Sequence, residues 1–353
     1  MRRHWRSSFI HVLGMAVRFH NGDTAAATAA EDRRAFAKLV LWCLSLGLIL
    51  AWTSLSLRFN TRQDTIYNLT AVLRGEPFRA GASFRSDLPF YNRVLFPVLY
   101  RGLLQLFPFA SESQWYLLLR IMSFQSAVLS FALVCRQCLS SSRVATVLAM
   151  AVLALATIAS FDFPWEEPSD AFDLMVIALG VGAALKRRFM LSLGLSIVFA
   201  ANRESAAFLG LIWFVLSASR ATWLRSGIEA TAICGLSYST ALFLKLAIGP
   251  RFISNYVNPA INLNLLWNSL HNFNPLSWLP MLVAVLILLV SLVDIRNSLV
   301  RRLVVLSFLL AGAAFLFGLV NEMRTFLPCF VLLGFAIAES ISSATCRRVT
   351  ADE

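Results

Sequence analysis

The topology of this chain depends on FMLSLGLSIVFAANRESAAFLGLIWFVLSA, residues 189–218. The stretch is apolar or small throughout, except for Asn202, Arg203 and Glu204 near its centre. As two helices, each half would measure about 20 Å at 1.5 Å per residue, too short for a hydrocarbon core of about 30 Å. As one helix, it would cross the core completely. The two interpretations put every later connection on opposite sides of a membrane.

The composition predicts that the protein lies in a membrane. Of the 353 residues, 58% are of apolar types and only 14% are charged, against roughly 45–50% and about 25% in soluble domains. The apolar residues, about 205, could supply on the order of ten spans of about 20 residues each. These values exclude a soluble enzyme, a disordered chain and a disulfide-stapled scaffold. They predict an all-α, polytopic transmembrane helical bundle of about ten spans.

Basic residues in the short connections favour two helices in 189–218. With that break, 12 basic residues fall inside the cell and 3 outside, whereas one long helix would move seven arginines outside. Cytoplasmic loops are enriched in Lys and Arg, so the net charge of +12 reflects topology and does not indicate nucleic acid as a partner. The predicted spans are 36–57, 115–135, 144–160, 170–185, 189–201, 205–218, 227–248, 277–293, 303–320 and 325–341.

We expect a multi-pass protein of the cell (inner) membrane, with both termini in the cytoplasm. Residues 1–35 form a basic cytoplasmic segment, either an amphipathic helix on the inner leaflet or an unstructured tail, without the pattern of a cleaved signal peptide. Residues 36–342 form a single polytopic membrane domain, and 343–353 a cytoplasmic tail. Within the domain, 58–114 is a long extracytoplasmic loop.

The end of that loop is predicted to carry an interfacial helix. In 94–109, polar or helix-breaking residues recur at spacings of four, four and three, which places them along one helical face. Counting this stretch as a span would invert all later charges, so we expect it to lie on the outer leaflet. The residues concerned are Pro97, Arg101, Gln105 and Pro108.

Four clusters of ionisable residues fall on the outer face in this topology. Such residues in or beside a membrane are costly and are therefore the first functional candidates. They also have structural interpretations: a solvated loop acid, a helix cap such as Ser169 or Asp170, or ion pairs between helices. The clusters are Asp64 with Tyr67; the acidic segment 162–170 with Asp173; Asn202, Arg203 and Glu204; and Asn321, Glu322 and Arg324.

The six cysteines are expected to be buried or cytoplasmic thiols. Cys135 and Cys138 have the spacing of a redox or metal motif, but no second Cys pair or His cluster follows them, and such sites need further ligands.

The order of these motifs resembles a known family. It comprises Asp64 and Tyr67 after the first span, the turn at 73–78, the segment Asn92–Pro97, the Asn-Arg-Glu junction at 202–204 and the late Asn-Glu-x-Arg at 321–324. Over roughly residues 40–340, the chain resembles bacterial polytopic membrane proteins related to the GT-C glycosyltransferases. The resemblance implies transfer of a sugar from a polyprenyl-phosphate-linked donor to a glycan or lipid acceptor, on the extracytoplasmic side.

The resemblance also implies roles for individual residues. The family's usual base maps onto Asp64, and arginines that hold the lipid phosphate map onto Arg93, Arg203 or Arg324. Many members carry two adjacent acids in this loop, whereas here Asp64 stands alone, so a second acid would come from Asp87 or the 162–170 loop. The substrate-binding candidates are Tyr67, Arg93, Asp162, Glu166, Glu167, Arg203, Glu204, Glu322 and Arg324.

No cofactor is established by the sequence, although the acids at 162–167 could bind a divalent cation through carboxylate oxygens. The expected partners are membrane lipid, the lipid-linked donor and the acceptor. Two alternative functions stay open: a transporter or flippase of a lipid-linked or anionic solute, because broken helices are also transporter features, and a polysaccharide polymerase.

Overall fold

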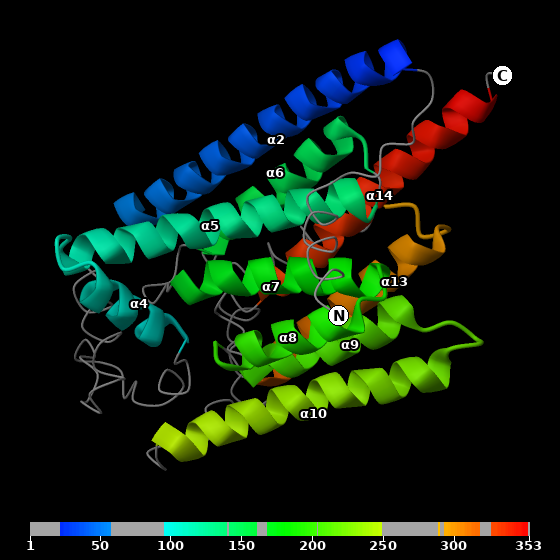
Figure 1. The fold of residues 1–353 in the computed structure, drawn as a ribbon. Coiled ribbons are helices and arrows are strands. Elements are labelled where there is room, and N and C mark those ends of the chain that lie inside the picture. The colour runs from blue at the N-terminus through cyan, green and yellow to red at the C-terminus, as the bar shows by residue number, and fades with distance from the viewer. Residues whose placement is uncertain are drawn as a thin grey trace, which may run out of the picture.

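The structure is a computed structural model, and every secondary-structure element in the described part of the chain is a helix (Figure 1). This confirms the predicted all-α class. The described residues are 22–57, 95–139, 141–160, 168–202, 204–248, 289, 293–317 and 326–351.

Each predicted span that lies in the described ranges coincides with a helix, whereas the span 277–293 falls almost entirely outside them. The α-helices are α2 (Gly22–Leu57), α4 (Leu95–Leu106), α5 (Glu112–Gln137), α6 (Arg143–Ser160), α7 (Pro168–Leu185), α8 (Phe189–Ala200), α9 (Phe208–Ser217), α10 (Trp223–Ile248), α13 (Ser298–Phe317) and α14 (Leu327–Ala351), and the 3-10 helix η3 (Glu204–Ala207) lies between α8 and α9.

Several helices are suited to crossing a membrane. Among the described residues, four segments are long and apolar enough by length and composition: Ala35–Thr53, Glu112–Gln137, Trp223–Leu244 and Leu327–Ala344. The apolar helices in Arg143–Ile158, Phe189–Ala200 and Phe208–Ser217 are shorter. The protein therefore has the features of a membrane protein.

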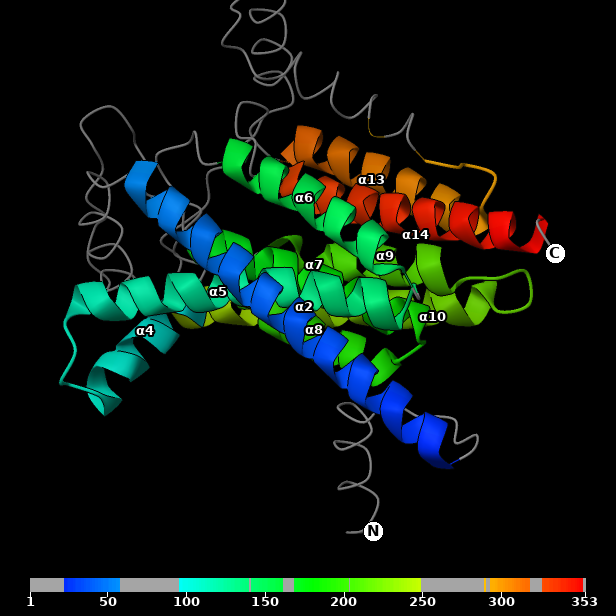
Figure 2. The same ribbon diagram turned by 90° about the horizontal axis from the view of Figure 1, so that it is seen from above.

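The helices pack in layers, with α5, α7 and α14 in the interior (Figures 1 and 2). Helix α2 covers α5 on one side, and α10 covers α8 and α9 on the other. Residues 331–338 of α14 are all buried, and the ring of Phe335 stacks on Phe131 of α5 at 4.4 Å between centroids. Apolar burial of this kind accounts for the position of α14 at the centre.

Glycines allow close helix approach at two of these interfaces. A Cβ on Gly47 of α2 would lie 2.6 Å from the Cα atom of Gln125, and one on Gly210 of α9 would lie 2.7 Å from the carbonyl oxygen of Ala230. Small residues at helix interfaces let backbones come together in this way in membrane proteins.

Helices α8 and α9 form an antiparallel hairpin. The Nη2 atom of Arg187, just before α8, donates to the carbonyl oxygen of Ser217 at the end of α9 over 3.0 Å. Near the same end, the rings of Phe189 and Trp213 meet edge to face at 5.7 Å. The chain therefore turns back at 201–207, which confirms two short helices and excludes a single 30-residue helix.

Helix α4 confirms the helix predicted in 94–109. Its side chains Phe96 and Tyr100 are buried against Trp115, Tyr116 and Leu119 of α5, while Arg101 and Gln105 on the predicted polar face are exposed. Twelve residues make a helix of about 18 Å, shorter than a hydrocarbon core. At its beginning, the Leu95 amide donates to the Ala201 carbonyl over 3.0 Å, so α4 is tied to the break between α8 and α9.

One expectation about a helix end needs correction. Ser169 and Asp170 were expected to suit an N-cap, but α7 begins at Pro168, so both lie inside the helix. Proline is favoured at the first helical position because it lacks the amide proton that would be unpaired there. At the C-terminus, α14 continues to Ala351, so most of the predicted cytoplasmic tail 343–353 is helical.

Candidate functional site

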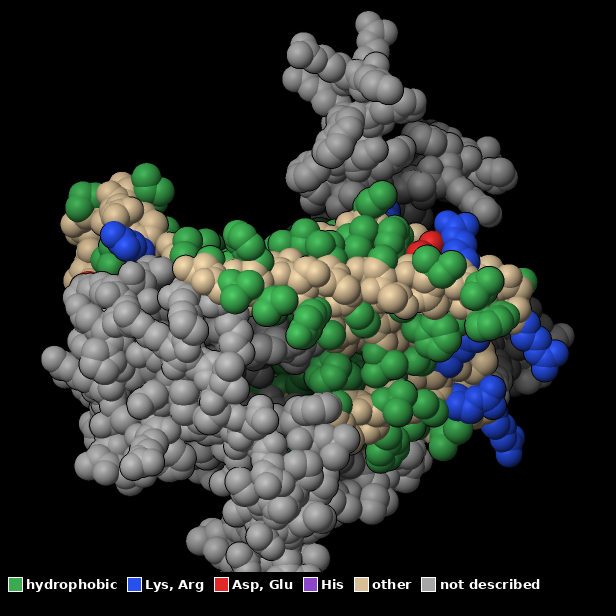
Figure 3. Space-filling model, turned by 90° about the horizontal axis from the view of Figure 1, so that it is seen from below, with side chains coloured by type: hydrophobic (Ala, Val, Ile, Leu, Met, Phe, Trp, Pro, Cys, Tyr) green, Lys and Arg blue, Asp and Glu red, His purple; other side chains and the backbone are tan. Residues whose placement is uncertain are grey.

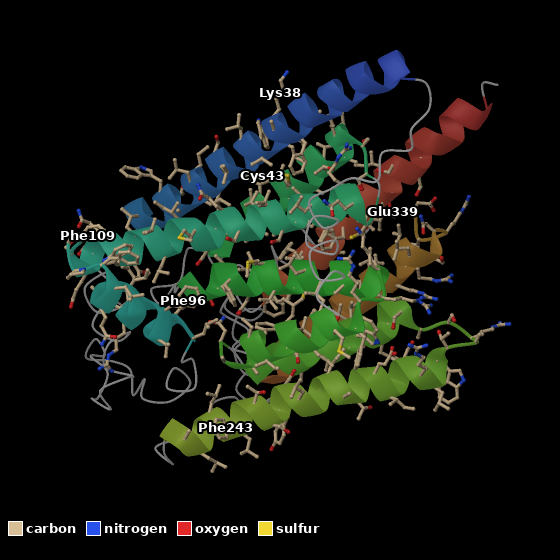
Figure 4. The ribbon with its side chains drawn as sticks, viewed as in Figure 1. Lys38, Cys43, Phe96, Phe109, Phe243 and Glu339 are labelled. Atoms are coloured by element: carbon tan, nitrogen blue, oxygen red, sulfur yellow. The ribbon has the colours of Figure 1, made fainter. Side chains whose placement is uncertain are left out.

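The two ends of the helix bundle differ in chemistry. One end, here called the basic end, carries the connections 138–142, 186–188, 218–222 and 293–297. Lys and Arg side chains gather there in the space-filling view (Figure 3). The opposite end, here called the α4 end, holds α4 and the break between α8 and α9. Phe96 and Phe109 mark the α4 end in Figure 4, and Glu339 lies toward the basic end.

Two arginines at the basic end cap the C-terminus of α9. The Nη1 atom of Arg302 donates to the carbonyl oxygen of Ala218 over 2.8 Å, with longer contacts to Leu216 at 3.4 Å and Val215 at 3.5 Å. Arg187 donates to Ser217 on the same helix end. The last carbonyls of a helix lack intrahelical donors and carry partial negative charge, so these arginines have a structural role.

Helices α13 and α14 are joined at the same end by hydrogen bonds. The Nδ2 atom of Asn297 donates to Glu339 Oε1 over 3.0 Å and to Ser343 Oγ over 3.0 Å. The amide of Asp294 donates to Ser340 Oγ over 3.0 Å. Because these groups bond within the protein, they fix the helix pair and are poor candidates for chemistry.

Buried charged and amide side chains distinguish the α4 end. Asp170 and Asp173 on α7 are 6% and 4% exposed, Arg120 on α5 is 4% exposed, and Asn202 is fully buried. The Nδ2 atom of Asn202 donates to Asp173 Oδ1 over 2.5 Å, which ties the break to α7. With Tyr116, whose hydroxyl accepts from Arg120 Nη1 over 2.8 Å, these residues are here called the buried polar residues.

Aromatic packing connects α4 to the buried polar residues. The ring of Phe172, between Asp170 and Asp173 in sequence, meets Phe96 of α4 edge to face at 5.6 Å. Phe172 also packs against the group that contains Tyr116. The first two turns of α7, the first half of α5 and the beginning of α4 are therefore neighbours.

The electrostatic cost of these residues makes the site a candidate for function. Charged groups inside an apolar domain are costly unless they are paired or hydrogen-bonded, and in membrane segments they mark substrate or ion sites. Asp170 lies in the first turn of α7, where the helix dipole favours a negative charge. Carboxylates here could accept a proton or bind sugar hydroxyls, and a guanidinium could bind phosphate.

Most residues predicted from the sequence lie outside the described residues. They are Asp64, Tyr67, Arg93, Asp162, Glu166, Glu167, Arg203, Glu322 and Arg324. Glu204 begins η3, and only its backbone is described.

The sequence interpretation missed Arg120 and did not select Asp170, Asp173 or Asn202 from their clusters. An arginine inside the predicted span 115–135 was the available signal for Arg120, because charge in a membrane segment is costly. For Asp173 and Asn202 no local signal distinguishes a buried group from a solvated one.

The described cysteines are free, as expected of buried thiols. Cys43, Cys135 and Cys329 are buried, and Cys138 and Cys234 are partly buried. Burial raises the pKa of the Cys138 thiol above its usual value, although Lys186 and Arg188 oppose that shift. The side chain of Cys346 lies outside the described residues. Among the residues that the structure describes, no three His, Cys, Asp or Glu side chains gather as metal ligands would.

Comparison of the chain with protein-family models, with characterised proteins and with solved structures finds no significant match. The function is therefore inferred from the residues and their geometry.

Proposed function

We propose that the protein is a GT-C-like glycosyltransferase of the inner membrane. It would transfer a sugar from a polyprenyl-phosphate-linked donor to a glycan or lipid acceptor at the extracytoplasmic face. The observation that carries the proposal is the burial of Arg120, Asp170, Asp173 and Asn202 at one end of an apolar helix bundle. This is the combination of cation and hydrogen-bonding groups that a phosphate-linked sugar requires.

The proposed topology has ten spans with both termini in the cytoplasm. Lys186, Arg187, Arg188, Arg220 and Arg225 all lie on connections at the basic end or on the first turn of α10. The positive-inside bias assigns that end to the cytoplasm. The α4 end then faces outward, as the motif order of the sequence also predicts.

The proposed reaction uses Asp64 as general base. Its carboxylate accepts the proton of the acceptor hydroxyl, whose oxygen forms the new bond to the sugar C1. The bond from C1 to the phosphate oxygen breaks, and the polyprenyl phosphate leaves with the electron pair. General-base catalysis contributes typically about 10²–10⁴-fold, and arginines stabilise the charge that develops on the phosphate.

A backbone hydrogen bond joins two residues that lie close in sequence to the proposed phosphate-binding arginines Arg93 and Arg203. Leu95, two residues after Arg93, donates its amide proton to the carbonyl of Ala201, two residues before Arg203, over 3.0 Å. This contact supports a shared role for Arg93 and Arg203. We assign Tyr67, Glu204, Glu322 and Arg324 to binding of donor or acceptor, and Asp162, Glu166 and Glu167 to sugar hydroxyls or a divalent cation.

The experiment that tests the proposal measures release of polyprenyl phosphate. The purified full chain is incubated with a panel of polyprenyl-phosphate sugars, and the products are separated by chromatography. We expect Asp64→Asn to abolish release and Asp294→Asn, at the basic end, to preserve it. Release at the wild-type rate by Asp64→Asn would show that Asp64 is not the base.

A transporter or flippase is the second candidate, because the broken hairpin of α8, η3 and α9 is also typical of transporters. A fluorescent lipid-linked sugar in proteoliposomes separates the two functions. Movement of the intact lipid across the bilayer without release of lipid phosphate would support transport. Growth of a glycan chain from one donor type would instead indicate a polymerase.

A further inference from the structure

We propose that a surface at the basic end binds the phosphate groups of anionic membrane lipids. The surface, here called the lipid-binding patch, consists of Lys186 and Arg188 on the turn between α7 and α8, Arg220 on the connection between α9 and α10, and Trp223 at the start of α10. This inference is independent of the proposed glycosyl transfer at the other end.

Three hydrogen bonds hold the segments of the patch together. Arg187 binds the Ser217 carbonyl over 3.0 Å, which places the turn 186–188 beside the end of α9. Arg302 binds the Ala218 carbonyl over 2.8 Å, and the connection is closed by a bond from the Thr222 amide to the Ser219 carbonyl over 3.1 Å. The patch is therefore a fixed arrangement of two segments that lie 30 residues apart in the sequence.

The three cations of the patch are available to a ligand. Lys186, Arg188 and Arg220 are exposed, and within the described part of the chain their side chains make no hydrogen bond or ion pair. Among the described side chains, Glu229 of α10 is already paired: it accepts from Arg225 Nε over 2.9 Å and from Trp213 Nε1 over 3.1 Å. The acids Asp294 and Glu339 lie with α13 and α14, where Asp294 Oδ1 accepts from the Arg296 amide and Glu339 from Asn297. Counted over the described side chains, the patch thus keeps a net positive charge.

The position of the cations argues for a lipid over a nucleic acid or an acidic protein. Arg220 lies three residues before the start of α10, whose outer face carries Trp223, Leu224 and Ile228, each more than 60% exposed. Only 17% of the apolar window in Trp223–Leu244 is buried, so this face can accommodate acyl chains. Tryptophan is enriched where a membrane meets water, and basic clusters beside apolar helix faces bind anionic headgroups.

The test measures which lipid the protein retains. The full chain is purified in mixed micelles of phosphatidylcholine with a minority of phosphatidylglycerol, and the co-purifying lipids are quantified by mass spectrometry. Each basic residue near an anionic surface contributes about fivefold, so we expect Lys186→Gln/Arg188→Gln/Arg220→Gln to lower the retained phosphatidylglycerol by roughly tenfold or more. The charge-conserving Arg188→Lys/Arg220→Lys should retain most of it.

The matched control removes the same charge from elsewhere at the same end. Arg143, Arg296 and Arg301 are also exposed, and the triple Gln variant at these positions should retain the lipid as the wild type does. Equal loss of retained phosphatidylglycerol in both triple variants would contradict specific binding by the patch and would indicate an effect of total charge. Two further results would contradict lipid binding by the patch. One is displacement of the lipid by dilute inorganic phosphate. The other is a Lys186→Gln/Arg188→Gln/Arg220→Gln variant that loses binding of an oligonucleotide but retains the lipid. Thermal unfolding of each variant verifies that it folds.

Discussion

Arg187 and Ser217 are joined by a hydrogen bond of 3.0 Å although 30 residues separate them. The bond brings the beginning of α8 and the end of α9 to the same end of the bundle. Between them the chain passes through η3 (Glu204–Ala207), beside the buried amide of Asn202. A polar break is thereby held inside the domain, where its unpaired backbone groups can be satisfied by protein partners.

Arg187 has a positive φ of 52°, a backbone conformation that costs a side-chain-bearing residue about 1–2 kcal/mol. We expect Arg187→Gly to be more stable than Arg187→Ala by roughly 0.5–1 kcal/mol, because both lose the bond to Ser217 but only glycine relieves the strain. SDS-driven unfolding in mixed micelles, followed by circular dichroism, measures the difference. Equal stabilities would mean that the strain at this turn is negligible.

Arg302 caps α9 through contacts to three carbonyl oxygens, the shortest 2.8 Å. Hydrogen bonds to charged groups contribute about 1.5–3 kcal/mol, so Arg302→Gln should lower the free energy of unfolding by roughly 1–3 kcal/mol. The control is Arg301→Gln, at the exposed neighbouring position, which should change it by less than about 0.5 kcal/mol. A loss of the same size in both variants would exclude a specific cap.

Gly210 and Gly235 offer a matched pair of glycine substitutions. A Cβ on Gly210 would overlap Cys234 Sγ and lie 2.7 Å from the Ala230 carbonyl oxygen, whereas one on Gly235 meets nothing within 4 Å. Gly210→Ala should therefore destabilise the protein by about 1–3 kcal/mol through overpacking. Gly235→Ala should be neutral or stabilising by up to about 1 kcal/mol, because alanine favours a helix. Thermal unfolding midpoints in detergent test both, and a harmless Gly210→Ala would disprove tight packing between α9 and α10.

Asp173 and Asn202 should be energetically coupled, because they share a buried hydrogen bond of 2.5 Å. Leaving one buried partner without the other costs about 1–3 kcal/mol, so Asp173→Ala and Asn202→Ala should each destabilise the protein. The double variant should lose less than the sum of the two, by about 0.5–3 kcal/mol. Additive losses in this double-mutant cycle would show that the bond does not couple α7 to the break.

The break itself could be predicted from the sequence. Two apolar halves of 189–218 flank Asn202, Arg203 and Glu204, and the distribution of arginines favoured a chain that turns back. In the structure, α8 ends at Ala200 and α9 begins at Phe208, as that interpretation requires. The amphipathic spacing in 94–109 likewise predicted α4, because helical periodicity is a local property.

The buried polar residues could be predicted only in part. Arg120 interrupts an apolar run, but whether its side chain meets solvent, lipid or protein depends on its neighbours in the fold, among them α7, which is distant in sequence. From the sequence, Arg187 and Arg302 were predicted only to be basic residues of the cytoplasmic connections. In the structure, both donate hydrogen bonds to carbonyl oxygens at the end of α9. Capping partners separated by 30 and 84 residues leave no signature in local spacing.

The amino-acid sequence was sufficient to predict an apolar, all-helical bundle, the positions of the helices in the described ranges and the position of the break. It could do so because apolar runs, charge positions and helical periodicity act between residues close along the chain. Which polar groups are buried together, and which arginines donate hydrogen bonds to backbone carbonyls, became known only from the tertiary structure. Burial and hydrogen bonding depend on the packing of segments far apart in the sequence, here α7 against α5 and α13 against the end of α9.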